Sequence, residues 1–406
     1  MFRFNLRAPA LAIAACALVC FSVSQAAAAQ ATDPPPEQKS SDVPATPPTP
    51  PADVPQQQPQ LAPQASPEAA AAAAVRATPA PAEGAPPAAG SDVAAFNTFR
   101  HDLINLVILS ADGRTLAAAA QIAAPDENDP TRTATKKTPG LIKRALQFGG
   151  QDPLVLWIAS SNACLTKPGC ADAAALKTLQ TVDADNAAVW LRSFPADDNA
   201  VRAQAIIARM AQAQRYDDYW GANVVALIHA LETLPVPESV ARQGVGVNAA
   251  RINFATSIAS SLIPGQLKQL NTFCAAAAGK DEALIGDCIA VARKLEAGGT
   301  FISQKIGFAV EKALVMPGVN RDVLLSRERS AAWQQEKFLE LSARFTREPA
   351  VAQSYVRLLS TEQNELAAVV ALLREQSVRS DPPAGWQAPS APVPADPLVA
   401  PPATQH

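Results

Sequence analysis

The sequence is poor in the residues on which nucleic-acid binding and cofactor binding usually depend. Of 406 residues only 5% are aromatic and 17% are charged, with 34 Lys and Arg against 37 Asp and Glu. This balance of charge excludes the basic surface that a nucleic-acid partner requires. The few aromatic rings leave little for stacking bases or for enclosing a cofactor. We therefore expect neither nucleic acid nor a cofactor as a ligand.

Histidine is scarce as well. The only three are His101, His229 and His406. The sequence contains no HExxH zinc motif, no phosphate-binding GxxxxGK[ST] loop, no GxGxxG and no GxSxG nucleophile elbow. Stretches that alternate apolar and polar residues, which are typical of strands, are also missing. These absences predict no β-sheet, and we assign no catalytic or metal-ligating residue.

The only long hydrophobic run lies at the N-terminus, over residues 8–23. Two arginines precede it and a row of small residues follows it, which is the order found in a secretory signal peptide. Cleavage after Ala28 or Ala29 predicts a signal peptide over residues 1–29. The run is shorter than the roughly 20 residues that a membrane-spanning helix needs. We therefore expect no transmembrane segment after cleavage.

An exported protein of this kind is predicted to reside in the periplasm of a gram-negative bacterium or to be secreted. The alternative is a lipoprotein, because residues 13–16 (Ile-Ala-Ala-Cys) fit the lipobox that precedes a lipidated cysteine. In that case Cys16 would anchor the chain, although the apolar run continues beyond it. Tethering to the membrane or to the cell wall is left open.

Proline is concentrated at the two ends of the chain. Residues 31–90 hold 16 of the 36 prolines, and residues 381–406 hold eight more. Segments this rich in Pro, Ala and Gln bury too little apolar surface to offset the entropy of ordering. The sequence predicts a disordered linker over 30–92 and a Pro-rich disordered tail over 377–406. Trp386 is the one residue of that tail suited to anchor it on the folded part.

Residues 93–376 carry the periodicity of helices. Apolar side chains recur at spacings of three and four residues in several stretches. Thr138-Pro139 and Asp152-Pro153 each place a capping side chain before a proline, which is typical of a helix start. We predict an all-α domain of about a dozen helices that stack as hairpins.

A weak repeat accompanies these helices. Asp152 lies five residues before Trp157, and Asp185 lies five before Trp190, with 33 residues between the two tryptophans; Trp220 follows 30 residues later. This spacing resembles the tetratricopeptide repeat, a helix pair of about 34 residues. The resemblance implies a superhelix of hairpins with a concave binding face. An irregular helical bundle, in which each Trp fills a gap between hairpins, is equally compatible with the pattern.

The cysteines allow the most definite prediction from the sequence. Four lie outside the predicted signal peptide: Cys164, Cys170, Cys274 and Cys288. An even number of cysteines in an exported chain indicates disulfides, and four of them allow three pairings. A Pro-Gly turn lies within the first pair, and a hairpin turn after Gly279 lies within the second. We predict Cys164–Cys170 and Cys274–Cys288.

Aromatic and acidic residues gather in one candidate binding surface: Tyr216, Asp217, Asp218, Tyr219 and Trp220. If this cluster is exposed, its rings could stack on a sugar and its acids could bind a basic peptide. If it is buried, an Asp caps a helix and the rings fill the core between hairpins. The sequence favours the second interpretation and leaves the first open.

One fragment suggests an enzyme. Glu238-Ser239 resembles the Glu-Ser pair of lytic transglycosylases, exported proteins with helical superhelices in which the glutamate is the general acid. The Gly-Leu-Met-Gln run of that family is missing here, and a proline followed by an acid is also an ordinary helix start. The sequence therefore predicts an exported helical module of the bacterial envelope for protein interaction or scaffolding, with a protein or peptide partner. The alternative is an enzyme acting on cell-envelope material, with Glu238 as the general acid.

Overall fold

The computed structural model describes residues 89–123, 138–166, 172–197, 199–237, 246–279, 281–316 and 318–388. The predicted signal peptide with Cys16, and nearly all of the predicted linker, lie outside these ranges. Cys170 and Glu238 lie outside them too, as does the tail after residue 388.

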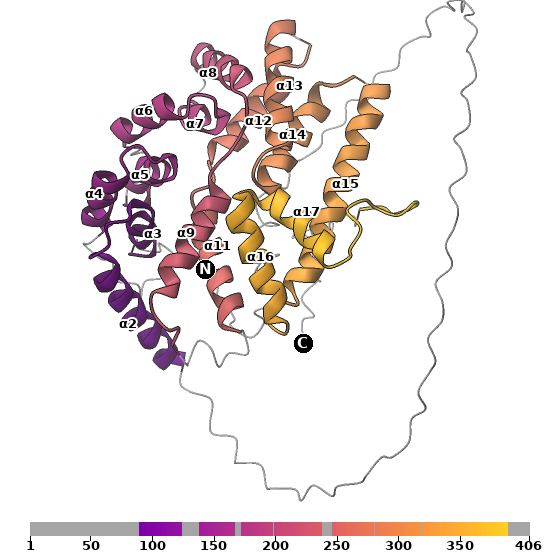
Figure 1. Ribbon diagram of the computed structural model, residues 1–406. Helices are drawn as coiled ribbons and strands as arrows, with labels where there is room; N and C mark the ends of the chain where they lie inside the picture. The colour runs from indigo at the N-terminus through magenta and orange to yellow at the C-terminus, as the bar shows by residue number, and fades with distance from the viewer. Residues whose placement is uncertain are drawn as a thin grey trace, which may run out of the picture. The chain divides into compact units, whose positions relative to one another are not determined.

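The described residues are helical and contain no strand, so the all-α prediction is confirmed for them (Figure 1). Helix α2 begins at Ala89 and α17 ends at Glu375, close to the predicted limits of 93 and 376. The helices are α2 (Ala89–Val107), α3 (Gly113–Ala123), α4 (Thr138–Gly149), α5 (Pro153–Thr166), α6 (Ala173–Val182), α7 (Ala187–Leu191), α8 (Ala200–Gln212), α9 (Trp220–Glu232), α11 (Val247–Ser260), α12 (Gln266–Ala276), α13 (Glu282–Glu296), α14 (Phe301–Leu314), α15 (Val319–Ser342), α16 (Pro349–Glu362) and α17 (Glu365–Glu375).

Side-chain caps explain several of the helix starts. The Asp152 carboxylate accepts hydrogen bonds from the main-chain N–H groups of Leu154 (2.9 Å) and Val155 (3.2 Å) at the start of α5. Asp281 accepts from two main-chain N–H groups at the start of α13 in the same way. These bonds satisfy donors that have no partner within the helix. The start predicted at Asp152-Pro153 is therefore confirmed.

The two sequence segments of the weak repeat, which contain Trp157 and Trp190, do not occupy equivalent positions in the structure. Asp152 caps α5, whereas the side chain that caps α7 is that of Asn186, the residue after Asp185. Trp157 is fully buried in the middle of α5, while Trp190 is half-buried near the end of the five-residue α7. The resemblance in sequence thus corresponds to two different local structures.

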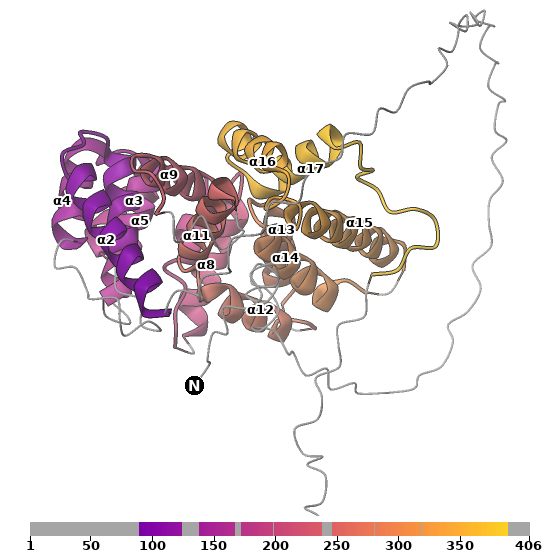
Figure 2. The same cartoon turned by 90° about the horizontal axis from the view of Figure 1, so that it is seen from below.

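Helices that follow one another pair as hairpins: α3 with α4, α5 with α6, α13 with α14, and α16 with α17. Other contacts join helices that are far apart in the sequence, since α9 packs against both α3 and α16, and α8 packs against α13. In Figure 2, α9 and α11 lie between the helices α2–α5 and the helices α13–α17. Helix α9 is buried on nearly every side, as expected of a helix at the centre of an all-α core.

Small residues let the N-terminal helices approach closely. The residues from Leu116 to Ala120 in α3 have no exposed surface. A Cβ atom on Gly113 would lie 2.9 Å from the main-chain nitrogen of Gly149, at the end of α4. No side chain fits there, so glycine is needed where the two helices meet.

Candidate functional site

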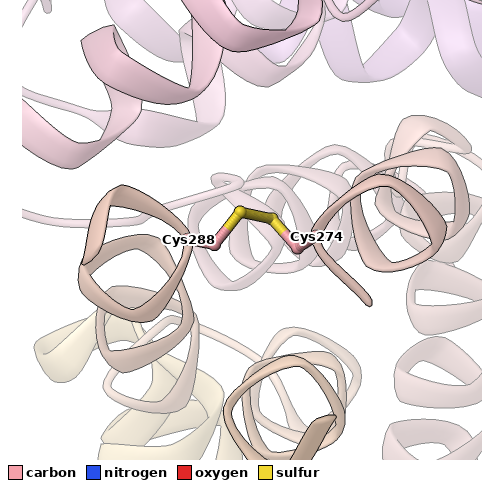
Figure 3. Close-up of a disulfide and its surroundings, with 2 residues drawn as sticks. All are labelled: Cys274 and Cys288. Atoms are coloured by element: carbon pink, nitrogen blue, oxygen red, sulfur yellow. A yellow bond between two sulfur atoms is a disulfide. The ribbon is translucent and has the colours of Figure 1, made fainter. Parts of the chain in front are cut away.

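The predicted disulfide Cys274–Cys288 is present. Cys274 in α12 and Cys288 in α13 are both fully buried, and their Cα atoms lie 5.8 Å apart (Figure 3). Gly279, with a φ of 72°, lies in the turn between the two helices. The hairpin therefore brings the two cysteines together as the sequence indicated. The predicted pair Cys164–Cys170 stays a prediction, because Cys170 and the side chain of Cys164 lie outside the described part.

The aromatic and acidic cluster at 216–220 is buried. Tyr216, Asp218, Tyr219 and Trp220 are each less than 9% exposed, and Asp217 is half-buried. The rings therefore do not form the exposed binding surface that the first interpretation required. The rings lie in the core between hairpins, as in the second interpretation.

Side chains from the loop between α6 and α7 hold this cluster in place. The amide of Asn186 donates to the main-chain oxygen of Asp217 (2.8 Å) and accepts from its N–H (2.8 Å). The carboxylate of Asp183 accepts from the guanidinium of Arg215 at 2.9 and 3.0 Å and from the hydroxyl of Tyr219. Tyr219 has a φ of 55°, and this network stabilises a conformation that is unfavourable for a residue with a side chain.

The same cluster contacts two other loops. Asp218 accepts a hydrogen bond from the hydroxyl of Thr300 (3.3 Å), which caps α14. Glu365, the first residue of α17, accepts from the main-chain N–H of Phe301 (3.0 Å). A Cβ on Gly221 would lie 2.6 Å from the main-chain oxygen of Gln363. The starts of α9, α14 and α17 therefore meet at one junction.

Two acids of this junction have raised pKa values. Burial raises the pKa of Asp218 to about 7, and the neighbouring charge of Asp217 adds to the effect. Burial also raises the pKa of Glu365 to about 7. Such values suit general acid–base chemistry. Here, however, both carboxylates accept main-chain N–H groups at helix starts, so their observed role is to join loops.

A second set of buried charges links three helices. Arg327 of α15 forms ion pairs with Glu296 of α13 and, at 2.9 Å, with Glu311 of α14. Arg293 reaches Glu311 from the other side at 3.3 Å. Burial, together with the hydrogen bond and the charge of Glu311, raises the pKa of Glu296 to about 8. The pattern of apolar residues contains no signal for this cluster, because Glu296, Glu311 and Arg327 are 15 to 31 residues apart.

One surface hollow lies between the loop before α3 and the loop before α5. Its volume is about 530 Å³, and an ion pair between Arg114 and Asp152 (2.7 Å) forms part of its wall. Phe148, at the end of α4, is 50% exposed and belongs to the lining. Leu109, just after α2, is 77% exposed.

Arg144 joins the loop that follows α2 to the ring of Phe148 at the end of α4. Arg144 donates to the main-chain oxygen of Ser110 (3.4 Å), next to Leu109, and its guanidinium lies 5.3 Å from the ring centroid of Phe148. Leu106, one turn earlier in α2, is exposed as well. We call Leu106, Leu109, Phe148 and the adjoining hollow the α2/α4 end surface. The sequence gives no signal for this surface, because each of its apolar residues alone fits the helical periodicity.

A second hollow, of about 640 Å³, lies on α15 and is lined partly by residues 385–388. Those residues belong to a segment that contacts α15 after the last helix has ended. The ring centroids of Trp386 and Trp333 are 5.3 Å apart. The folded part therefore extends beyond residue 376, and Trp386 makes the contact for which the sequence singled it out.

Within the described ranges, no group of three or more His, Cys, Asp or Glu side chains is arranged to hold a metal ion. Among the helices of those ranges, none combines the length and the apolar character that crossing a membrane demands. Comparison of the chain with models of protein families, with curated proteins and with solved structures finds no match.

Proposed function

We propose that this chain is an exported helical module of the bacterial envelope that binds a protein or peptide partner, as an interaction or scaffolding protein. The observation that carries the proposal is the α2/α4 end surface. Phe148 is a large apolar side chain that remains exposed in the wall of a polar hollow, and Leu109 is exposed in the loop that Arg144 joins to it. An aromatic ring next to an arginine and an apolar neighbour is the composition typical of the central part of a protein interface.

The envelope location is supported by two independent features. Residues 1–29 have the organisation of a signal peptide. The disulfide Cys274–Cys288 is of a kind that persists in oxidising compartments and is rare in the cytosol. A periplasmic or secreted protein is therefore our proposal, with lipidation at Cys16 as the alternative.

The pairing of successive helices supports a tetratricopeptide-like arrangement of hairpins. In such repeat proteins partners bind on surfaces built from successive helix pairs. The α2/α4 end surface instead combines the ends of two helices that both pack against α3. No observation on the described residues favours the alternative of an enzyme, and Glu238 lies outside them.

Site-specific photo-crosslinking in the native host tests the proposed function. A photoreactive amino acid at Leu109 should give a discrete adduct with a partner, because this side chain would lie in the interface. The matched control is Val201 on α8, which is also apolar and is 81% exposed. Adding Phe148→Ser to the Leu109 probe should reduce the adduct several-fold. Equal adducts at positions 109 and 201, or no adduct at either, would count against the proposal.

A further inference from the structure

The residues after the last helix lie along α15, which holds them through side-chain donors. The indole N–H of Trp333 donates to the main-chain oxygen of Arg379 at 2.9 Å. The side-chain amide of Gln334 donates to the main-chain oxygen of Ser380 at 3.2 Å. We call residues 377–388 the C-terminal strap.

Arg329 holds the other end of the strap. Its Nη2 donates to the main-chain oxygen of Pro383 and its Nε to that of Trp386, both at 2.9 Å. The Trp386 ring meets the ring of Trp333 edge to face, with an interplanar angle of 79°. Lys337 lies 4.4 Å from the centroid of Trp333 and packs against its ring.

All four of these hydrogen bonds end on main-chain oxygens of the strap. Such acceptors are present in any sequence, and they are most available in an extended proline-rich chain, which has no internal hydrogen bonds. Proline-rich segments are commonly bound by surfaces that combine aromatic rings with side-chain donors. The face of α15 formed by Arg329, Trp333 and Gln334 has this composition, and the strap contains Pro382 and Pro383.

The hollow beside the strap gives the face room for a longer ligand. It is lined on α15 by Leu325, Glu328 and Ala332, and Leu325 is 42% exposed. The strap forms its other wall with residues 385–388. A bound segment that continues along α15 would cover Leu325 and remove this apolar side chain from water.

We propose that the face of α15 formed by Arg329, Trp333 and Gln334 binds an extended proline-rich segment of a partner protein, and that the C-terminal strap occupies this face as an internal competitor. This inference rests on the proposed function as an interaction module, and it adds a second site and the class of its ligand. The strap identifies the ligand chemistry: main-chain oxygens before a proline pair, and then a turn from Pro383 to Trp386 that ends in one aromatic ring.

Binding of a labelled synthetic peptide with the sequence of residues 377–388 tests the inference. The peptide is titrated by fluorescence anisotropy against the full chain and against its Trp386→Ala variant, in which the strap has lost its ring contact. We expect the variant to bind the peptide at least about tenfold more tightly than the unchanged chain, because its internal competitor is weakened. Equal affinity for both chains would overturn the competitor role of the strap.

Further substitutions in the Trp386→Ala chain locate the site. Trp333→Ala should weaken peptide binding by about tenfold or more, and Trp333→Phe should weaken it less, because the ring stays and only the N–H donor is lost. Val323→Ala, at an exposed position elsewhere on α15, is the matched control and should leave the affinity unchanged. A peptide in which Ala replaces both prolines should bind more weakly. Binding that survives Trp333→Ala would overturn the proposed site.

Hydrogen exchange on the unchanged chain avoids any effect of the variants on folding. The main-chain N–H of Trp386 donates to the oxygen of Pro383 (3.2 Å), so its exchange should be slow. An excess of peptide should displace the strap and speed exchange in residues 379–388, and unchanged exchange would contradict displacement. These measurements use purified components, so a missing adduct at Leu109 would affect only the proposed function, and failed peptide binding only this inference.

Discussion

Two regions of the molecule bury polar side chains between helices in opposite ways. Between α3 and α9, the amides of Gln121 and Asn223 bond reciprocally at 2.7 and 3.0 Å, and both residues are buried and uncharged. Between α13, α14 and α15, two carboxylates share the guanidinium of Arg327. The amides of Gln121 and Asn223 satisfy each other's hydrogen bonds without any charge. The strength of the contacts of Arg327 depends instead on which of its two carboxylates carries a proton.

The difference extends beyond these side chains. The α3/α9 region contains closely packed alanines and the fully buried Trp157. The region of α12–α15 contains the disulfide Cys274–Cys288 as well as the ion pairs. We therefore expect redox conditions and the titration of Glu296 to act on the second region, and only changes of packing or hydrogen bonding to act on the Gln121–Asn223 contact of the first.

The largest effect is expected from Trp157→Ala in the first region. The Trp157 ring centroid lies 5.3 Å from that of Tyr219 and 3.5 Å from the guanidinium of Arg192. Removing the ring should lower the free energy of unfolding by about 3–5 kcal/mol, because a cavity replaces it. Urea denaturation at pH 5.5 and 8.5 should give the same loss at both values. Trp190→Ala, at a half-buried tryptophan, is the control, and an equal loss there would show that burial is not the cause.

In the second region, removing the disulfide by the double change Cys274→Ala and Cys288→Ala should cost about 3 kcal/mol, because the unfolded chain regains the freedom of a loop of this length. A reductant should destabilise the unchanged chain by a similar amount. In the double variant the reductant should have a clearly smaller effect on the urea midpoint, because only the predicted pair Cys164–Cys170 could then respond. A remaining effect would place redox sensitivity at other cysteines.

A smaller loss is expected from Gln121→Leu at the neutral pair. The amide of Asn223 then stays buried without its partner, which costs about 1–3 kcal/mol. Adding Asn223→Leu should recover part of this loss, because no buried polar group then lacks a partner. The loss should be independent of pH. If the second substitution lowers the stability further by a similar amount, the pair is not coupled as the distances imply.

At low pH, the smallest effect on the free energy of unfolding is expected from Glu296→Gln. This effect should also have a characteristic dependence on pH. Because the pKa of Glu296 is raised from 4.5 to about 8, the folded chain keeps a proton that the unfolded chain releases. Its contribution to stability is complete below about pH 4.5 and is lost as the pH rises towards 8. The pKa of Glu311 is lowered, so its contribution changes only at lower pH.

Unfolding measured at pH 5, 6, 7 and 8 should therefore show a decline in the unchanged chain that is less steep in Glu296→Gln. Asp218 and Glu365, with pKa values raised to about 7, contribute a decline of the same sign, so some slope should remain. Gln121→Leu is the control that keeps the full slope. If the free energy of unfolding of Glu296→Gln changes with pH as steeply as that of the unchanged chain, the Glu296 carboxyl does not take up a proton on folding.

The helices, and the local contacts that close within one hairpin, could be predicted from the order of the amino acids. Asp152 caps the helix that it precedes, and Cys274 meets Cys288 across a single turn. These features depend on residues only a few turns apart, so periodicity, capping preferences and helix geometry are sufficient to predict them.

The packing of helices that are distant in the chain, by contrast, sets which surfaces are buried and which acids meet. The acidic and aromatic residues 216–220 have the composition of an exposed site, yet the loops before α14 and α17 cover them. Glu296, Glu311 and Arg327 become partners because three helices pack together. The strap reaches α15 across about 50 residues of chain. Such contacts follow from how the helix faces pack, which a periodic pattern of apolar residues does not specify.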